Sequence, residues 1–335
     1  MAATPPSPAP LQETPGAGLI TVPNRILSAP EFQYLADVPA ETQWFANVDN
    51  PNTRRAYQAD LAGFIRFTGI VQPLEFRLVT RSHVLAWRAE LEKQSLSGAT
   101  IRRKLAALAS LFEYLCEQNA ITHNPVKGVK RPRVDSQIGK TPALSNLQAR
   151  RLLDAPASDT LKGQRDRAIL SVLLHHGLRR EELTKLKVKD FGQEDRHGPR
   201  MRVWGKGGKV RYLPIHPETL ELVKAYLNSA GHGDQPCSWL FKSVSHHIQN
   251  NATGGLTPGG VYSEVVKRYM LPLGITGENM GPHALRATAA TCALENHADI
   301  AKVQEWLGHS SINTTRVYDR REMRAPDSPT FKIMY

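Results

Sequence analysis

The feature that most constrains the fold of this chain is a change in the spacing of its apolar residues. From residue 39 to about residue 120, apolar side chains recur three and four positions apart, which is the pattern of helices packed on one face. Alternation of apolar and polar residues, which is typical of a β-strand, appears in residues 200–204 and 210–215. The chain is therefore predicted to fold as an all-helical module followed by a mixed α+β domain.

A chain of 335 residues is long enough for two such domains. Asn52 and Thr53 follow a proline and are good N-cap residues, so a helix is predicted to start at one of them. Asn124-Pro125 ends the last helix of the module, because a residue before proline resists the α-helical conformation. The other predicted helices of the module are residues 41–48, residues 80–94 and a helix that starts near Ser97.

The second domain is predicted to begin near Leu144 and to contain one β-hairpin. The two strands flank a Gly-rich turn, residues 205–209, which carries Lys206 at its tip. Residues 231–258 are rich in Gly, Asn and Ser and are predicted to form a loop. The predicted helices are residues 145–154, 165–176, 179–186, 217–230, 259–270, 282–296, 299–307 and 311–319.

The chain is strongly basic, with 43 lysines and arginines against 31 aspartates and glutamates and a net charge of +12. Such a surplus favours a polyanionic partner: DNA, RNA or an acidic membrane surface. Basic side chains gather on the polar faces of the N-terminal helices, where we expect contact with the DNA backbone; the alternative is a merely solvated surface. The predicted DNA-binding residues are Arg54, Arg55, Arg102, Arg103, Lys104, Lys127, Lys130 and Arg131.

Two segments are predicted to lie outside the folded domains. Residues 1–38 are rich in proline and almost uncharged, so they are predicted to form a disordered arm, with a docking segment as the alternative. Residues 126–142 hold five basic residues and one acidic residue, which predicts an extended linker that lies on phosphate. The predicted domains are then residues 39–125 and residues 143–335, the second ending in a C-terminal tail.

The sequence argues against several other classes of protein. No apolar run approaches the roughly 20 residues that span a bilayer, and the N-terminus lacks the features of a secretory signal, so we expect a cytoplasmic protein with no membrane partner. The three cysteines are widely spaced, which argues against both a disulfide scaffold and a Cys-based zinc site. The adjacent pairs His175-His176 and His246-His247 do not share a helix face, so no metal site is predicted.

Four short patterns of the second domain carry side chains suited to an anion. Arg179 opens a helix after Gly177, so its charge adds to free backbone N–H groups, and Glu182 lies on the same face. The hairpin supplies Lys206. The remaining two patterns are His283-Ala284-Leu285-Arg286, whose ends are i, i+3 neighbours, and Leu307-Gly308-His309 with Tyr318 nine residues after the histidine.

Each pattern alone is weak, but their order along the chain resembles the catalytic set of the tyrosine recombinases, the family of phage integrases, Cre and Xer enzymes. The resemblance covers residues 39–318 and includes the helical module, the Asn124-Pro125 break and the basic segment after it. It implies a SAM-like, all-helical core-binding domain, which binds DNA, and a mixed α+β catalytic domain. The long N-terminal arm and the Gly/Asn-rich loop depart from a minimal Xer enzyme.

The resemblance also implies roles for the site residues, which their chemistry supports. Tyr318 is the nucleophile, and Arg179 and Arg286 hold the non-bridging phosphate oxygens bidentately, as lysine cannot. Lys206 protonates the departing 5′-oxygen; Lys209 is the alternative. The two histidines complete the set: His283 accepts the proton of the nucleophile or holds the phosphate, and His309 donates to the phosphate.

The implied reaction is a transesterification through a 3′-phosphotyrosyl intermediate and a Holliday junction. It conserves bond energy, so we expect no cofactor, metal or ATP. The expected partner is double-stranded DNA with two inverted half-sites, bound by a homotetramer or by a tetramer shared with a paralogous recombinase. A bacterial, nucleoid-associated location follows. The rivals are a type IB topoisomerase and a non-catalytic DNA-binding regulator.

Overall fold

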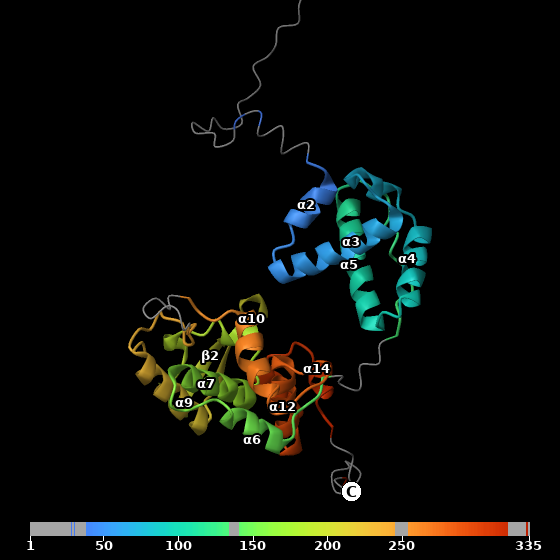
Figure 1. Ribbon diagram of the computed structural model, residues 1–335. Helices are drawn as coiled ribbons and strands as arrows, with labels where there is room; N and C mark the ends of the chain where they lie inside the picture. Colours follow the sequence, from blue (N-terminus) through green and yellow to red (C-terminus); the bar gives the residue numbers. More distant parts are fainter. Residues whose placement is uncertain are drawn as a thin grey trace, which may run out of the picture. The chain divides into compact units, whose positions relative to one another are not determined.

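The computed structural model describes residues 38–133, 141–244 and 254–320, together with Ser28, Pro30 and Ile333, and of Lys206 the backbone alone (Figure 1). The predicted N-terminal arm and most of the C-terminal tail lie outside the described residues. The chain divides into two compact units, Met1–Val134 and Asp135–Tyr335.

The N-terminal unit is a helical module built around its longest helix, α5. Helices α2, α3 and α4 all pack against α5. The core is rich in aromatic rings, and Phe64 meets Trp87 edge to face with ring centroids 5.0 Å apart. The helices of this unit are α2 (Ala40–Ala46), α3 (Pro51–Thr68), the 3₁₀ segment η1 (Pro73–Leu78), α4 (Arg81–Lys93) and α5 (Gly98–Glu117).

The start of α3 differs from the predicted position. The N-cap is Asn50, whose side-chain oxygen accepts hydrogen bonds from the backbone N–H groups of Asn52 and Thr53 at 2.9 and 3.2 Å. Pro51 occupies the first helical position, where its missing N–H costs no hydrogen bond. The prediction was therefore wrong in treating proline as a residue that precedes the helix.

The boundary between the N-terminal module and the linker also differs from the prediction. Val126 and Val129 are 4% and 8% exposed and belong to the core of the N-terminal unit. Arg88 then donates a 2.9 Å hydrogen bond to the carbonyl of Lys130, which holds the following turn against α4. A linker beginning at residue 126 is therefore wrong, because apolar burial outweighs the basic composition there. Residues 134–140 lie outside the described residues.

The second unit is organised around α7 (Leu161–His176), which packs against α6 (Asn146–Asp154), α9 (Pro217–Ala230) and α12 (Pro282–Glu295). Apolar residues lie on most sides of α7, as expected for a helix covered by neighbours. The shorter helical segments are α8 (Arg180–Leu183), η2 (Val188–Asp190), η3 (Lys206–Gly208), α10 (Pro258–Gly260), the π-helix η4 (Val261–Lys267), α11 (Arg268–Met270), α13 (Ile300–Leu307) and α14 (Ile312–Arg316).

The sheet of this unit has three antiparallel strands in the order β1-β2-β3. The predicted hairpin corresponds to β2 (Gly198–Trp204) and β3 (Val210–Pro214), paired so that Met201 faces Leu213. The third strand, β1 (Gln193–Asp195), was not predicted, because its three exposed polar residues show no alternation. Pairing with β2 alone makes it a strand.

A small apolar cluster joins the C-terminal helices. Ala287, Ala290 and Leu294 of α12 pack with Val303 and Leu307 of α13. Tyr318, which follows α14, is the last member of this cluster. Within the described parts of the chain, no helix combines the length and apolar character needed to cross a membrane.

Candidate active site

A cavity of about 460 Å³ opens beside the end of α7 and the start of α12. It brings together Arg179, His283 and Arg286, which the sequence analysis had selected from segments about a hundred residues apart. The remaining lining residues are Leu178, Arg180, Glu181, Tyr262, Asn279, Met280, Gly281 and Pro282. A cavity lined by three arginines is suited to an anion.

Arg286 is almost fully buried, yet one of its donors has no partner. Its two Nη atoms donate to the carbonyl oxygens of Gly177 and Leu307 at 2.5 and 2.7 Å, but Nε has no hydrogen-bond partner within the described residues. Burial, and next the charge of Arg179, lower the pKa of Arg286 to about 10, so it stays charged at neutral pH. A charged guanidinium that lines a cavity is suited to an oxyanion, and the unpartnered donor favours an anionic neighbour.

Gly177 is required where the end of α7 meets the end of α13. Its φ is +58°, the left-handed conformation that closes a helix. A Cβ there would also lie 2.9 Å from a methyl carbon of Leu307. This close approach lets the guanidinium of Arg286 bind the carbonyls at both helix ends.

Arg179 is the N-cap residue of α8, and Glu182 orients it. The guanidinium donates to Glu182 Oε1 at 2.8 Å, and the backbone N–H of Arg179 donates to Oε2 at 2.9 Å. Burial alone would raise the pKa of Glu182, but hydrogen bonds and charge from arginines, with the backbone N–H, outweigh it and lower that pKa. Glu182 is therefore an ionised partner of the arginines.

Arg211 is a site residue that the sequence analysis missed. It donates to both carboxylate oxygens of Glu182, at 3.1 and 2.8 Å, and its Nε donates to the carbonyl of Trp306 at 3.1 Å. One side chain thus connects β3, α8 and the end of α13. The available signal was an arginine two residues before the buried Leu213, hence on the inward face of a strand.

His309 receives a hydrogen bond from Arg286, since the Arg286 Nη2 lies 2.9 Å from His309 Nε2 and a guanidinium can only donate. The ring proton therefore sits on Nδ1, which faces Thr315 Oγ1 at 2.8 Å. Burial, followed by the charges of Arg286 and Arg179, lowers the pKa of His309 to about 4. In this arrangement Nε2 is an acceptor, whereas the predicted role was donation to a phosphate.

His283 lies at the exposed mouth of the cavity. Loss of water at the cavity wall, followed by the charges of Arg286, Arg179 and Arg180, lowers its pKa. His283 is therefore neutral at physiological pH and able to accept a proton. A bound anion would oppose the arginine charges and raise this pKa, which favours proton uptake while an anion is present.

Tyr318 lies behind His309, with the two ring centroids 6.0 Å apart and the planes tilted by 24°. It is 5% exposed, and its backbone carbonyl accepts a 3.2 Å hydrogen bond from the hydroxyl of Thr291. It does not line the cavity, and His309 connects it to Arg286. The structure therefore places the predicted nucleophile in the same group of side chains as the arginines.

The backbone of Lys206 lies at the hairpin tip, where η3 makes the turn between β2 and β3. The backbone N–H of Gly205 donates to the carbonyl of Lys209 at 2.7 Å and closes the turn. Gly207 and Gly208 both have positive φ, which explains the glycines at these positions. The side chain of Lys206 lies outside the described residues, so its place relative to the cavity stays a prediction.

Several of the predicted DNA-binding residues make contacts within the N-terminal unit. Arg54 donates to the carbonyls of Val48 and Ala46 at 3.0 and 3.1 Å and so caps the end of α2. Arg103 and Lys104 pair with the buried carboxylate of Asp60. Arg102 donates to the carbonyl of Pro132 at 3.3 Å. The exposed members of the predicted set are Arg55, Arg102, Arg103, Lys127, Lys130 and Arg131.

Comparison with known protein families agrees with this site. Residues 143–324 match the Phage integrase family, and residues 45–119 match the family described as Phage integrase, N-terminal SAM-like domain. The first match spans the cavity, the hairpin and Tyr318. The second spans the helical module.

Individual relatives match over most of their length. The tyrosine recombinase XerC of Myxococcus xanthus is 35% identical over 272 residues, which cover 80% of this chain and 87% of the relative. The tyrosine recombinase XerD of Listeria monocytogenes is 30% identical over 270 residues, again 80% and 87% of the two chains. The two family models follow one another along this chain, with the SAM-like domain first.

The fold is shared with a solved recombinase. The structure of the XerH site-specific recombinase bound to palindromic difH substrate superposes with a TM-score of 0.62 at 24% identity, covering 79% of this chain and 75% of that one. The predicted fold class, a SAM-like helical domain followed by a mixed catalytic domain, is thereby confirmed. From its sequence matches and its site, the chain belongs to the phage integrase family of tyrosine recombinases.

Proposed function

We propose that this DNA breaking and rejoining enzyme carries out site-specific recombination with Tyr318 as nucleophile and with the cavity of Arg179, His283 and Arg286 as the site of the scissile phosphate. The observation that carries this assignment is the cavity that brings Arg179, His283 and Arg286 together, with one donor of the buried Arg286 lacking a partner within the described residues. A non-bridging phosphate oxygen supplies the acceptor that this donor lacks. Phosphates are the anionic groups of DNA, which is the expected partner.

In the first step the Tyr318 oxygen forms a bond to phosphorus and the bond from phosphorus to the 5′-oxygen breaks. Negative charge on the phosphoryl oxygens grows in the transition state, and preorganised donors are most effective there. Arg179 and Arg286 supply those donors. Glu182 and Arg211 hold Arg179 in place, so little reorganisation is needed when the phosphate arrives.

Two proton transfers accompany this step. Neutral His283 takes the phenolic proton of Tyr318, and Lys206 gives a proton to the departing 5′-oxygen. His309 supports Arg286 through the 2.9 Å hydrogen bond and turns its Nε2 to the phosphate when the anion restores its basicity. A 5′-hydroxyl of the partner duplex then attacks the phosphotyrosine and reverses the chemistry.

The assembly that we propose is a tetramer on two duplexes, with two inverted half-sites on each, proceeding through a Holliday junction. It contains four copies of this chain or includes a paralogous recombinase. The palindromic substrate in the XerH structure supports inverted half-sites, and the bacterial Xer relatives support action on DNA in the bacterial cytoplasm. The remaining predicted DNA contacts are made by basic residues of the helical module and of the segment that follows it.

The proposal is tested by trapping the covalent complex on nicked suicide substrates and sequencing the attached DNA. A recombinase should enrich one palindromic site and should exchange strands between two labelled duplexes that carry it. Relaxation of supercoiled plasmid without a site or a second duplex would instead indicate a topoisomerase. Absence of any covalent complex would support the non-catalytic regulator.

Arg211→Lys should slow formation of the covalent adduct by about 100-fold, with DNA affinity unchanged. Lysine keeps the charge but cannot bind both oxygens of Glu182 and the Trp306 carbonyl together, and a misplacement of about 1 Å in an active site costs about 10²-fold. Single-turnover cleavage on a suicide substrate measures the rate. Arg200→Lys on the neighbouring strand, where Arg200 pairs with Asp195, is the matched control. A wild-type rate for Arg211→Lys would remove the positioning role.

Affinity for non-specific duplex should fall steeply with salt. A protein that neutralises about 6–10 phosphates loses roughly 10³–10⁵ in affinity between about 50 and 200 mM salt. Fluorescence anisotropy across this range gives the slope of log affinity against log salt concentration. Arg131→Ala, which removes one predicted phosphate contact, should reduce the magnitude of this slope by about one. Lys224→Ala on α9, outside the predicted contacts, should not. A flat salt dependence would contradict the proposed backbone contacts.

A further inference from the structure

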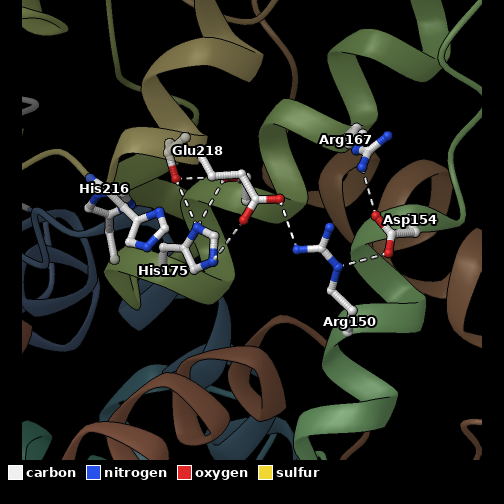
Figure 2. Close-up of polar contacts among 9 residues, drawn as sticks. Arg150, Asp154, Arg167, His175, His216 and Glu218 are labelled. Atoms are coloured by element: carbon white, nitrogen blue, oxygen red, sulfur yellow. Dashed lines mark hydrogen bonds and ion pairs between the residues drawn. The ribbon is translucent and has the colours of Figure 1, made fainter.

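Three potential metal ligands meet at a second place in the catalytic unit, where α7 ends and α9 begins (Figure 2). His175 lies in the last turn of α7, His216 is the N-cap residue of α9, and Glu218 lies in its first turn. One ligand atom from each lies within 4.8 Å of the others. None of the three lines the phosphate cavity, so the proposed recombination does not account for this cluster.

Two of the ligand atoms lie slightly farther apart than those around a bound transition metal, and the stacked ring of His216 must turn to join them. Tetrahedral Zn²⁺ with bonds of about 2.0–2.1 Å places its ligand atoms about 3.3–3.4 Å apart. His175 Nε2 and Glu218 Oε2 are 3.8 Å apart, and the rings of His175 and His216 stack with centroids 4.1 Å apart. His216 is exposed, so a rotation of its ring can complete the set without repacking a core.

The ring of His175 is held in the orientation that a metal ligand needs. Its Nδ1 lies 3.0 Å from the Oγ1 of Thr219 and 3.3 Å from the Oγ of Ser171, both buried, so Nε2 is the nitrogen turned toward Glu218. A hydrogen bond to the second ring nitrogen is the usual support of a metal-binding histidine.

Glu218 is held by a chain of ion pairs that leaves one oxygen for a metal. Arg150 donates to Oε1 at 3.1 Å, while Oε2 faces His175. Figure 2 shows that Asp154 in turn binds Arg150 at 2.9 Å and Arg167 at 2.7 Å. Arg150 is thus kept on the far oxygen and does not compete for Oε2.

The backbone of His216 is fixed independently of its ring. Its N–H donates to Nε2 of His176 at 3.1 Å, and His176 is 1% exposed. The adjacent histidines of α7 therefore have separate roles: His176 anchors the chain before α9, and His175 faces the cluster. Two neighbours on a helix cannot form a clamp, and the residue that pairs with His175 comes instead from the start of α9.

We propose that His175, His216 and Glu218 bind a divalent transition metal of the Zn²⁺ type, which ties the end of α7 to the start of α9. Two imidazoles and one carboxylate suit Zn²⁺ better than Mg²⁺ or Ca²⁺, which prefer oxygen ligands. The role is structural. The tie secures the helix that ends three residues before Arg179 and the segment that follows strand β3, and it adds no group to the phosphate cavity.

The test uses the full chain stripped of metal with a chelator and titrated with Co²⁺. We expect one Co²⁺ per chain, seen as the visible absorption of tetrahedral Co²⁺ and displaced by Zn²⁺. His216→Ala, an exposed change that should not disturb folding, and Glu218→Gln should each weaken binding by at least the roughly 10–100-fold that loss of a supporting hydrogen bond costs. Zn²⁺ should raise the Tm of the wild type and leave that of His216→Ala unchanged.

The matched controls remove the other histidine pair and an exposed thiol. His246→Ala with His247→Ala, outside the described residues, and Cys237→Ser should bind Co²⁺ as the wild type does. Equal binding by wild type and His216→Ala, binding lost only in the control variants, or no Co²⁺ bound at all would overturn the proposal. A metal-dependent cleavage rate without a Tm shift would overturn the structural role.

Discussion

Tyr318→Phe should bind DNA as the wild type does and form no covalent protein–DNA adduct. The phenolic oxygen is the atom that would bond to phosphorus, and phenylalanine cannot replace it. The aromatic ring still fills the apolar cluster of Ala287, Ala290 and Leu294, and the backbone carbonyl still accepts from Thr291. The expected loss is therefore in chemistry alone. Denaturing gels of complexes trapped on nicked suicide substrates measure the adduct.

Tyr212→Phe is the matched control, since Tyr212 is 53% exposed on the hairpin strand β3. It should form adduct at the wild-type level. Thermal unfolding of both variants should agree with the wild type, which excludes misfolding as the cause. An adduct that resists detergent in Tyr318→Phe would show that the nucleophile is a different residue.

Lys206→Ala should cleave ordinary DNA about 10²–10⁴-fold more slowly than the wild type, which is the usual contribution of a positioned general acid. A 5′-alkoxide is a poor leaving group and needs a proton as it departs. A 5′-thiolate needs far less help, because a thiol has a pKa of about 8.5. A substrate with a bridging 5′-sulfur at the scissile phosphate should therefore restore cleavage by Lys206→Ala almost to the wild-type rate.

Two variants define the controls for this sulfur rescue. Arg179→Ala should stay slow on the sulfur substrate, because its proposed contact is with non-bridging oxygens. Lys209→Ala should cleave ordinary DNA normally. Sulfur rescue of Lys209→Ala in place of Lys206→Ala would move the general acid by three residues along the turn. Rescue of neither would point to His283 or His309 as the proton donor.

Local sequence signals predicted the helices whose first or last residue is set by its neighbours along the chain. The helix at Asn146–Asp154 follows Ser145, whose hydroxyl accepts from the backbone N–H of Gln148, and α9 starts at a proline and ends before Gly231. These signals act within one turn of helix, so they can be read from the chain. Strand β1 and the burial of Val126 depend on partners elsewhere and were missed.

In the candidate site, too, some features could be predicted from the sequence and others depend on contacts between distant segments. The order of Arg179, Lys206, His283 with Arg286, His309 and Tyr318 was enough to indicate the family, because each residue type has the chemistry that phosphoryl transfer needs. Which nitrogen of His309 carries a proton was not predictable, since Arg286 sets it across 23 positions of sequence. Arg211 was missed for the same reason.

By itself, then, the sequence determined the family and the helical and mixed domains, and it predicted the reacting groups, because these follow from residue type, spacing and order. The tertiary structure alone decided which polar groups face one another. Among the described residues it left the Arg286 Nε–H without a partner, placed Arg211 on Glu182, and stacked the ring of His175 on the ring of His216. Burial and long-range charge produce these effects, and both depend on packing between segments far apart in the chain.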